Sequence, residues 1–125
     1  MSWRTWGVYL WGFVAGATLA TYVAVSCAPT QAQSEEVAGA IHQAAVTYGV
    51  SEGWMRRIAY CESRYTPWVT SRGGHMGLFQ YAPQTWRTFS RWAGHEGTSP
   101  YDPWSAAMVT AYALSRGYAG HWACS

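Results

Sequence analysis

The stretch SEEVAGAIHQAAVTYGVSEGWMRRIAYCES (residues 34–63) predicts two consecutive amphipathic helices. Through its first half, apolar side chains recur at the spacing of one helical face, between an expected N-cap at Ser34 and a helix end at Gly49. Ser51 is the expected N-cap of the second helix, whose apolar face continues to Glu62. A carboxylate therefore falls on a helical face that packs against the core.

The sequence downstream predicts two more helices, separated from the first pair by a long irregular segment. Pro83 suits the first position of a helix, and Asp102 caps a last long helix that stops at Gly117. Residues 65–81 contain three glycines and one proline without helical periodicity, so we expect a loop or a short irregular hairpin there. The sequence thus predicts a mainly α fold in one compact domain, residues 34–125.

The composition excludes several classes of protein. Only 11% of the 125 residues are charged and 17% are aromatic, which argues against a disordered tail and against a coiled coil. Eight basic residues, all arginine, against six acidic ones leave a net charge of +2. This charge is too small for a nucleic-acid footprint, so we expect no nucleic-acid partner.

The amino-terminal residues predict an export or anchor segment. Residues 6–25 carry no charge, follow the single cation Arg4, and as a helix would span about 30 Å. This length favours a retained membrane anchor over a cleaved signal peptide, whose apolar region is shorter. We therefore assign residues 1–27 to a signal peptide or membrane anchor that contacts the membrane, with Cys27 as a possible lipidation site, and residues 28–33 to a linker. The domain that follows is expected outside the cytoplasm.

The cysteines predict a covalent link across the domain. A small exported domain has a limited core and commonly needs a disulfide, for which Cys61 and Cys124 are the natural pair. Closing a loop of about sixty residues contributes about 4 kcal/mol in the chain-entropy model. A nucleophilic Cys61 with a histidine base, as in a thiol peptidase, is the alternative.

Glu62 is the acidic residue without an evident structural role. The other five occupy expected first helical turns, a helix cap or an exposed loop: Glu35, Glu36, Glu52, Glu96 and Asp102. Burial near aromatic side chains would raise the pKa of Glu62 and leave a protonated carboxyl that can serve as a general acid. The alternative is an ion pair with Arg57 or Arg64, which would lower that pKa.

Other chemistries have no matching pattern in the sequence. The four histidines form none of the common zinc-binding spacings, so we expect no metal and no cofactor. The chain also has no phosphate-binding loop, dinucleotide fingerprint or nucleophile elbow.

The segment ESRYTPWVTSRGGHMGLFQYAPQT (residues 62–85) carries three short motifs at fixed separation: Glu-Ser, Gly-Leu-x-Gln and Pro-x-Thr. In this it resembles the soluble-lytic-transglycosylase-like (SLT-type) domains of the lysozyme superfamily, which cleave bacterial peptidoglycan. The segment covers about a quarter of the expected exported part. The resemblance implies a lysozyme-like α+β fold and glycan strands of peptidoglycan as the binding partner.

The resemblance also implies a role for each matched position. Glu62 would protonate the oxygen of the β-1,4 bond between N-acetylmuramic acid and N-acetylglucosamine, and Ser71, Gln80 and Thr85 would line the saccharide groove. A lytic transglycosylase needs one carboxylate, because the 6-hydroxyl of the sugar closes a 1,6-anhydro ring and no water is required. Aromatic side chains stack on sugar rings, and the candidates are Tyr65, Tyr81, Trp86, Tyr112 and Trp122.

The sequence departs from the larger family near its end. The family carries Ala-Tyr-Asn there, for which Tyr112 is the available substitute. The short tail and the pair Cys61 and Cys124 instead resemble the compact resuscitation-promoting factors. Lysozyme-type hydrolysis and a non-catalytic module that binds the cell wall therefore remain as alternatives.

Overall fold

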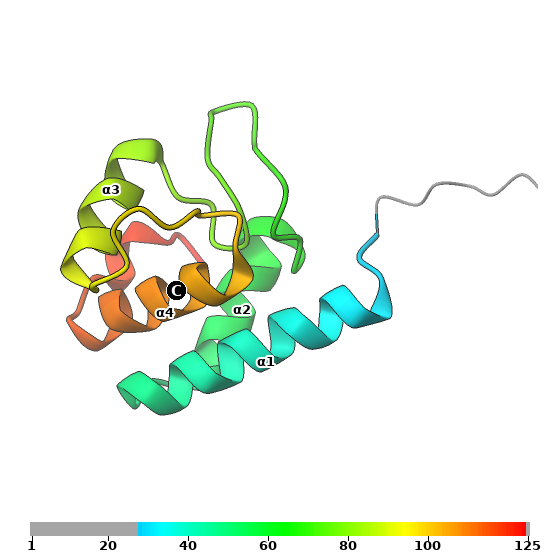
Figure 1. Cartoon of the computed structure of the whole chain (residues 1–125), viewed down its shortest axis with the longest axis horizontal. Coiled ribbons are helices and arrows are strands. Elements are labelled where there is room, and N and C mark those ends of the chain that lie inside the picture. The colour runs from blue at the N-terminus through cyan, green and yellow to red at the C-terminus, as the bar shows by residue number, and fades with distance from the viewer. Residues whose placement is uncertain (1–27, 125) are drawn as a thin grey trace, which may run out of the picture.

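The computed structural model describes residues 28–124, which form one helical domain (Figure 1). Its elements are α1 (Gln31–Tyr48), α2 (Glu52–Ser63), α3 (Pro83–Trp92), α4 (Pro103–Ser115) and the short 3-10 helix η1 (Ala119–His121). The expected mainly α fold is confirmed for this part of the chain. None of these helices is long and apolar enough to cross a bilayer, and the expected export segment lies outside the described residues.

Three of the expected helix ends are confirmed by their caps. The Ser51 hydroxyl accepts a hydrogen bond from the Trp54 N–H at the start of α2, and the Asp102 carboxylate accepts one from the Ser105 N–H at the start of α4. Gly49 ends α1 in the left-handed conformation. The local sequence signals therefore place these ends correctly.

The start of α1 was expected at Ser34, and this expectation was wrong. The helix begins one turn earlier, because Thr30 and Gln33 form a capping box in which each side chain accepts a hydrogen bond from the other residue's N–H. Residues 31–33, expected in the linker, are helical. Glu35 and Glu36 accordingly lie beyond the first turn.

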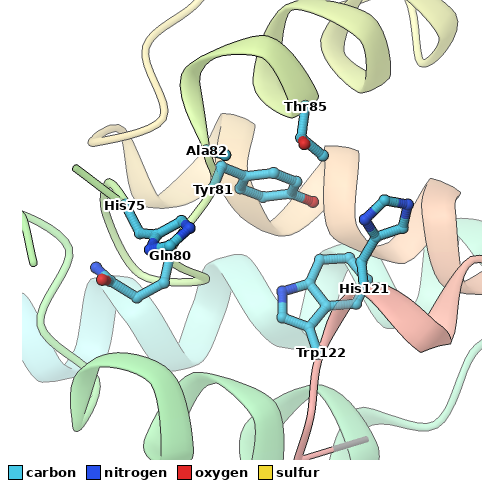
Figure 2. Close-up of a pocket in the computed structure, with 7 residues that line it drawn as sticks. All are labelled: His75, Gln80, Tyr81, Ala82, Thr85, His121 and Trp122. Atoms are coloured by element: carbon cyan, nitrogen blue, oxygen red, sulfur yellow. The ribbon is translucent and has the colours of Figure 1, made fainter. Parts of the chain in front are cut away.

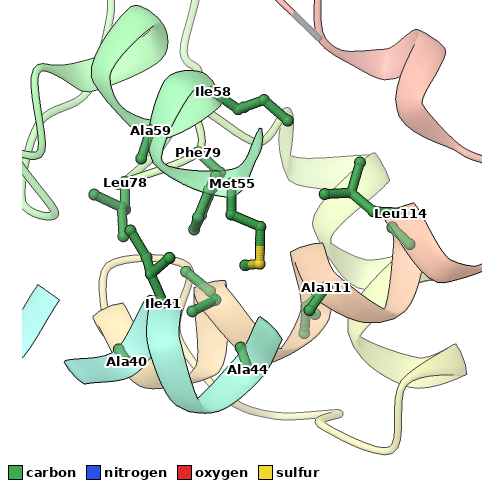
Figure 3. Packing of buried hydrophobic residues seen from close by; sticks show 14 of the residues in the cluster. Ala40, Ile41, Ala44, Met55, Ile58, Ala59, Leu78, Phe79, Ala111 and Leu114 are labelled. Carbon is green, nitrogen blue, oxygen red and sulfur yellow. The ribbon is translucent and has the colours of Figure 1, made fainter. Parts of the chain in front are cut away.

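The core lies where α1, α2 and α4 meet, and α1 packs chiefly against α4 (Figures 1 and 3). Alanines such as Ala44 and Ala111 are fully buried, and their small side chains let the helices approach closely. Larger fully buried side chains, among them Met55, Ile58 and Phe79, fill the space beside them. Each contributes about 1.5–3 kcal/mol through burial of apolar surface.

The segment between α2 and α3 is the irregular part of the domain. The expected hairpin is reduced to two isolated bridges, one between Thr70 and Met76 and one between Met76 and Tyr81. Gly77 is required here, because its φ is +77° and a Cβ atom would lie 2.0 Å from the Pro100 carbonyl oxygen. This close approach fixes the segment against the start of α4.

Candidate functional site

Glu62 lies in the last turn of α2, between two residues that are tied to other parts of the chain. On one side Cys61 forms the expected disulfide with Cys124, with 6.3 Å between the two Cα atoms. On the other side the buried Ser63 hydroxyl donates to the Leu78 carbonyl at 2.8 Å. The carboxyl end of the chain and the irregular segment are therefore both held beside Glu62.

The Glu62 carboxyl is partly buried and its pKa is raised. Burial is the main cause, because it disfavours the charged form, and the nearby His75 offsets part of the effect. Within residues 28–124, Glu62 makes no ion pair with Arg57 or Arg64. The Arg64 guanidinium instead lies over the Tyr60 ring, 4.4 Å from its centroid, and donates to the Tyr60 hydroxyl. The alternative in which an arginine pairs with Glu62 is therefore not what the structure shows.

The other carboxylates of the described segment have different surroundings. Glu52 is paired with His42 and Arg56, and Glu96 is paired with Arg91. Asp102 accepts from the Ser105 backbone N–H and hydroxyl, and the two acids of α1, Glu35 and Glu36, are exposed. Among residues 28–124, Glu62 is thus the partly buried carboxyl without a hydrogen-bond partner.

The domain has a pocket of about 130 Å³, whose lining does not include Glu62 (Figure 2). Its lining comes from the irregular segment, the first turn of α3 and the carboxyl-terminal segment: His75, Gln80, Tyr81, Ala82, Thr85, His121 and Trp122. His75 lines this pocket and also acts electrostatically on Glu62. The expected groove residues Gln80 and Thr85 are brought together here.

Gln80 is held in an unusual backbone conformation at the pocket wall. Its φ is +53°, in the left-handed region that non-glycine residues seldom adopt. Its side-chain amide donates to the carbonyls of Gly77 at 2.9 Å and Val69 at 3.3 Å, which leaves the amide oxygen as a hydrogen-bond acceptor. Strained residues of this kind are enriched at binding sites, where the surrounding structure enforces them.

Ser71 lies outside the pocket lining and contacts the pocket through His75. Its exposed hydroxyl accepts from the His75 backbone N–H at 3.1 Å and lies 3.4 Å from the His75 ring nitrogen Nδ1. Ser71 therefore orients a residue of the pocket wall.

Tyr81 contributes its ring to the pocket and directs its hydroxyl into the core. The hydroxyl is hydrogen-bonded to the buried Thr110 at 2.8 Å, and burial raises the pKa of Tyr81 far above its ordinary value. The ring packs edge-on against Trp86 and Trp122. The Trp122 indole N–H in turn donates to the Phe79 carbonyl at 2.9 Å. The rings of Tyr81 and Trp122 are therefore each held in place by a hydrogen bond.

Tyr112 lies away from this pocket. Its ring packs edge-on against Tyr48 of α1, with 5.9 Å between the ring centroids, and Arg116 lies over it at 5.2 Å. The structure thus places Tyr112 at the contact between α1 and α4. The expected substitute for the tyrosine of the Ala-Tyr-Asn motif is not brought to Gln80 and Thr85.

Sequence reasoning missed His75 and His121 as parts of the pocket, because it weighed the histidines only as metal ligands or as bases for Cys61. Two signals were present. His75 lies inside the recognised motif, between Ser71 and Gly77, and His121 lies three residues before Cys124, whose disulfide partner adjoins Glu62. Since Cys61 is bridged to Cys124, a thiol nucleophile at this position is also not available.

The family model for the transglycosylase SLT domain matches residues 39–121, about two thirds of the chain. No curated protein and no solved structure matches the chain. The matched range includes α2, the irregular segment, α3 and α4, and with them Glu62 and all but one of the residues that line the pocket. The chain therefore belongs to the family of SLT transglycosylase domains, which act on peptidoglycan.

Proposed function

We propose that this domain is a lytic transglycosylase that cleaves the β-1,4 bond between N-acetylmuramic acid and N-acetylglucosamine, with Glu62 as general acid and then general base. The observation that carries the proposal is the state of Glu62. It is a partly buried carboxyl with a raised pKa and no hydrogen-bond partner in the described segment, and His75, which acts on it electrostatically, lines the pocket. A carboxyl in this state keeps its proton available for a leaving group.

The proposed reaction balances with one carboxyl. Glu62 donates its proton to the bridging oxygen as the bond between that oxygen and C1 of the muramic acid breaks. The resulting carboxylate takes the proton of the 6-hydroxyl on the same sugar while that oxygen bonds to C1. The products are a 1,6-anhydro-muramoyl end and a free 4-hydroxyl on the N-acetylglucosamine, and Glu62 is protonated again.

The electrostatics of Glu62 favour this one-carboxyl reaction over the usual hydrolytic ones. In a retaining glycosidase a second carboxylate lies about 5 Å from the acid and raises its pKa through charge repulsion. For Glu62 the causes of the pKa shift are burial and His75, with no contribution from another acid. No second carboxylate of the described segment acts on Glu62, and we therefore propose the 6-hydroxyl of the substrate as the nucleophile.

Gln80 and Thr85 are proposed to hold the sugar in the pocket. The Gln80 amide oxygen accepts hydrogen bonds from a sugar hydroxyl or N-acetyl N–H, since its amide nitrogen is already bound to two carbonyls. Thr85 offers its hydroxyl from the first turn of α3. We further propose that residues 1–27 export the domain and tether it to the membrane, consistent with the disulfide, which persists in oxidising compartments.

Digestion of purified peptidoglycan, followed by mass spectrometry of the soluble products, tests the proposal. We expect muropeptides that are one water lighter than hydrolysed ones, and none from the Glu62→Gln variant. Products with the mass of hydrolysed muropeptides would show that the domain is a lysozyme-type hydrolase and not a lytic transglycosylase. Binding to the wall without release of fragments by either protein would identify a non-catalytic binding module.

A further inference from the structure

A second pocket, of about 270 Å³, lies between the first half of α1 and α2 with the residues that follow α2. Its lining combines apolar side chains with two cations: Pro29, Ser34, Val37, Ala38, Arg56, Arg64 and Tyr65. None of these residues lines the pocket that contains Gln80 and Thr85. The second pocket is therefore a separate site, which the proposed reaction does not use.

Two residues in the wall of this pocket have a strained backbone. Arg64 and Tyr65 have φ values of +53° and +62°, and Gln80 is the third non-glycine residue of the described segment in the left-handed region. Glycine is the usual residue at a left-handed helix end such as the one that Arg64 forms after α2. An arginine and a tyrosine held there against this preference indicate a use for their side chains at the pocket wall, as for Gln80 in the first pocket.

The positive charge of the two arginines is compensated only in part. The Arg64 guanidinium contacts the ring and hydroxyl of Tyr60 and forms no ion pair within residues 28–124. Arg56 donates to Glu52 through Nε and Nη2, which leaves its Nη1 without a hydrogen bond in this part of the chain. Guanidinium groups bind phosphate through parallel charge-assisted hydrogen bonds, so the pocket suits an oxyanion.

The rest of the lining is mostly apolar. Val37 is buried, and Pro29, Ala38 and Tyr65 are partly buried. A ligand that fits both parts of the pocket carries an oxyanion beside an apolar group, as a phospholipid does. Tyr60 is 48% exposed and its ring centroid lies 5.5 Å from that of Tyr65. Tyrosine side chains favour the boundary between water and lipid, which agrees with this assignment.

The position of the pocket in the chain also favours a lipid. Pro29, in the pocket wall, follows Val25 by four positions, and Val25 ends the uncharged stretch of residues 6–25. Four residues of extended chain span at most about 14 Å. The amino-terminal end of α1 is also one extremity of the domain (Figure 1). The proposed membrane tether therefore keeps this pocket close to the lipid headgroups.

We propose that the second pocket binds an anionic phospholipid, with Arg56 and Arg64 on the headgroup phosphate and the apolar wall against the adjoining glycerol and acyl groups. The inference rests on the proposed tether, which identifies the ligand. Glu35 and Glu36 are exposed on α1 and lie outside the lining, so attraction depends on contacts within the pocket rather than on diffuse positive charge. Because Arg64 follows Glu62 by two positions, a bound lipid orients the end of α2 that carries Glu62 relative to the bilayer.

The test uses the full chain in lipid nanodiscs and follows the guanidinium Nε–H signals of its eight arginines by NMR. The probe is phosphatidylglycerol, added in steps to discs of phosphatidylcholine. We expect the Arg56 and Arg64 signals to shift and saturate, and Arg64→Gln to weaken the apparent affinity at Arg56 about tenfold. Arg64→Gly should weaken it equally without loss of stability, since glycine suits the left-handed conformation, and this result separates binding from misfolding.

Arg57→Gln is the matched control, because Arg57 is exposed on α2 and lines neither pocket. It should leave the affinity within about twofold of the wild type. Equal weakening by Arg57→Gln and Arg64→Gln would overturn the inference, since the attraction would then be diffuse. Saturation of the Arg64 signal by inorganic phosphate in discs of phosphatidylcholine alone would also overturn it, because the ligand would then be a free anion.

Failure of the underlying proposals shows in other measurements. A mature chain that lacks residues 1–27 by mass and is recovered outside the membrane fraction would contradict the tether. Release of muropeptides that Glu62→Gln leaves unchanged would contradict the proposed reaction. Neither result depends on the arginine signals.

Discussion

The two ends of α2 each carry a glutamate, and the pKa values of these two glutamates are shifted in opposite directions. At the amino-terminal end, a hydrogen bond with His42 at 2.8 Å and a second one with Arg56 lower the pKa of Glu52. At the carboxyl-terminal end, burial raises the pKa of Glu62, which has no such partners in the described segment. Glu52 is therefore more readily ionised than an ordinary glutamate, and Glu62 is less readily ionised.

The helix itself contributes to this difference. The amino-terminal turn of a helix favours a negative charge and the carboxyl-terminal turn disfavours it. Glu52 lies in the first turn of α2 and Glu62 in the last. Position along the helix, partners and burial therefore act in the same direction, and Glu52 is an internal reference for Glu62.

The largest expected effect is on catalysis. Glu62→Gln preserves the shape of the side chain and removes its transferable proton, so release of muropeptides should fall by about 10³-fold. Glu52→Gln should stay within about twofold of the wild type, because this residue pairs with α1 and with its own helix rather than with the pocket. Initial rates of release from purified cell wall measure both. Equal losses in the two variants would assign the effect to folding rather than to chemistry.

The next largest effect concerns the disulfide that adjoins Glu62. Replacing both Cys61 and Cys124 with serine opens a loop of 63 residues and should lower the free energy of unfolding by about 4 kcal/mol. Activity should fall further than stability alone explains, because His121 and Trp122 reach the pocket through this segment. Urea unfolding and wall digestion at low temperature separate the two effects. A variant with unchanged activity would show that the pocket does not need the link.

Gly77 tests how firmly the irregular segment is held near Glu62. Gly77→Ala should lower the free energy of unfolding by about 3 kcal/mol or more, since the added Cβ would overlap the Pro100 carbonyl. Gly74→Ala is the control, because Gly74 has a similar φ of +81° with no atom within 4 Å of a Cβ. It should cost only about 1–2 kcal/mol of backbone strain. Similar costs for the two substitutions would contradict the close approach.

The smallest expected effect is on the pH dependence of stability, and its sign differs between the two glutamates. The folded protein resists ionisation of Glu62, so the wild type loses stability relative to Glu62→Gln as the pH rises through the raised pKa of this residue. For Glu52 the folded protein favours the ionised form. The wild type should therefore be more stable than Glu52→Gln at neutral pH, and the difference should disappear as the pH falls through the lowered pKa. Thermal unfolding at a series of pH values measures both trends, and trends of the same sign would refute the contrast.

Much of the fold could be predicted from the sequence because its signals are local. Ser51, Asp102 and Gly49 act on N–H and carbonyl groups within a few residues, so their caps follow directly from the sequence. The start of α1 was harder to predict, because Thr30 and Ser34 are both suitable N-caps. The reciprocal hydrogen bonds of Thr30 and Gln33 favour Thr30. Helix ends depend on such small differences in free energy.

The site was predictable only in part. The motif identified Glu62, Gln80 and Thr85, and the structure brings the last two into one pocket. Tyr112 packs against Tyr48 of α1, because that face of α4 is turned toward α1. Consecutive residues of a helix lie on different faces, so the sequence alone does not show whether Tyr112 faces α1 or the pocket.

The proposed role of Glu62 requires that it hold its proton more tightly than an ordinary glutamate. Carbon-13 NMR titration of the side-chain carboxyls in the folded domain tests this directly, with Glu52 in the same spectra as the reference. We expect Glu62 to titrate above the ordinary pKa of glutamate and Glu52 below it. A Glu62 carboxyl that is already ionised at the pH where Glu52 titrates would contradict it.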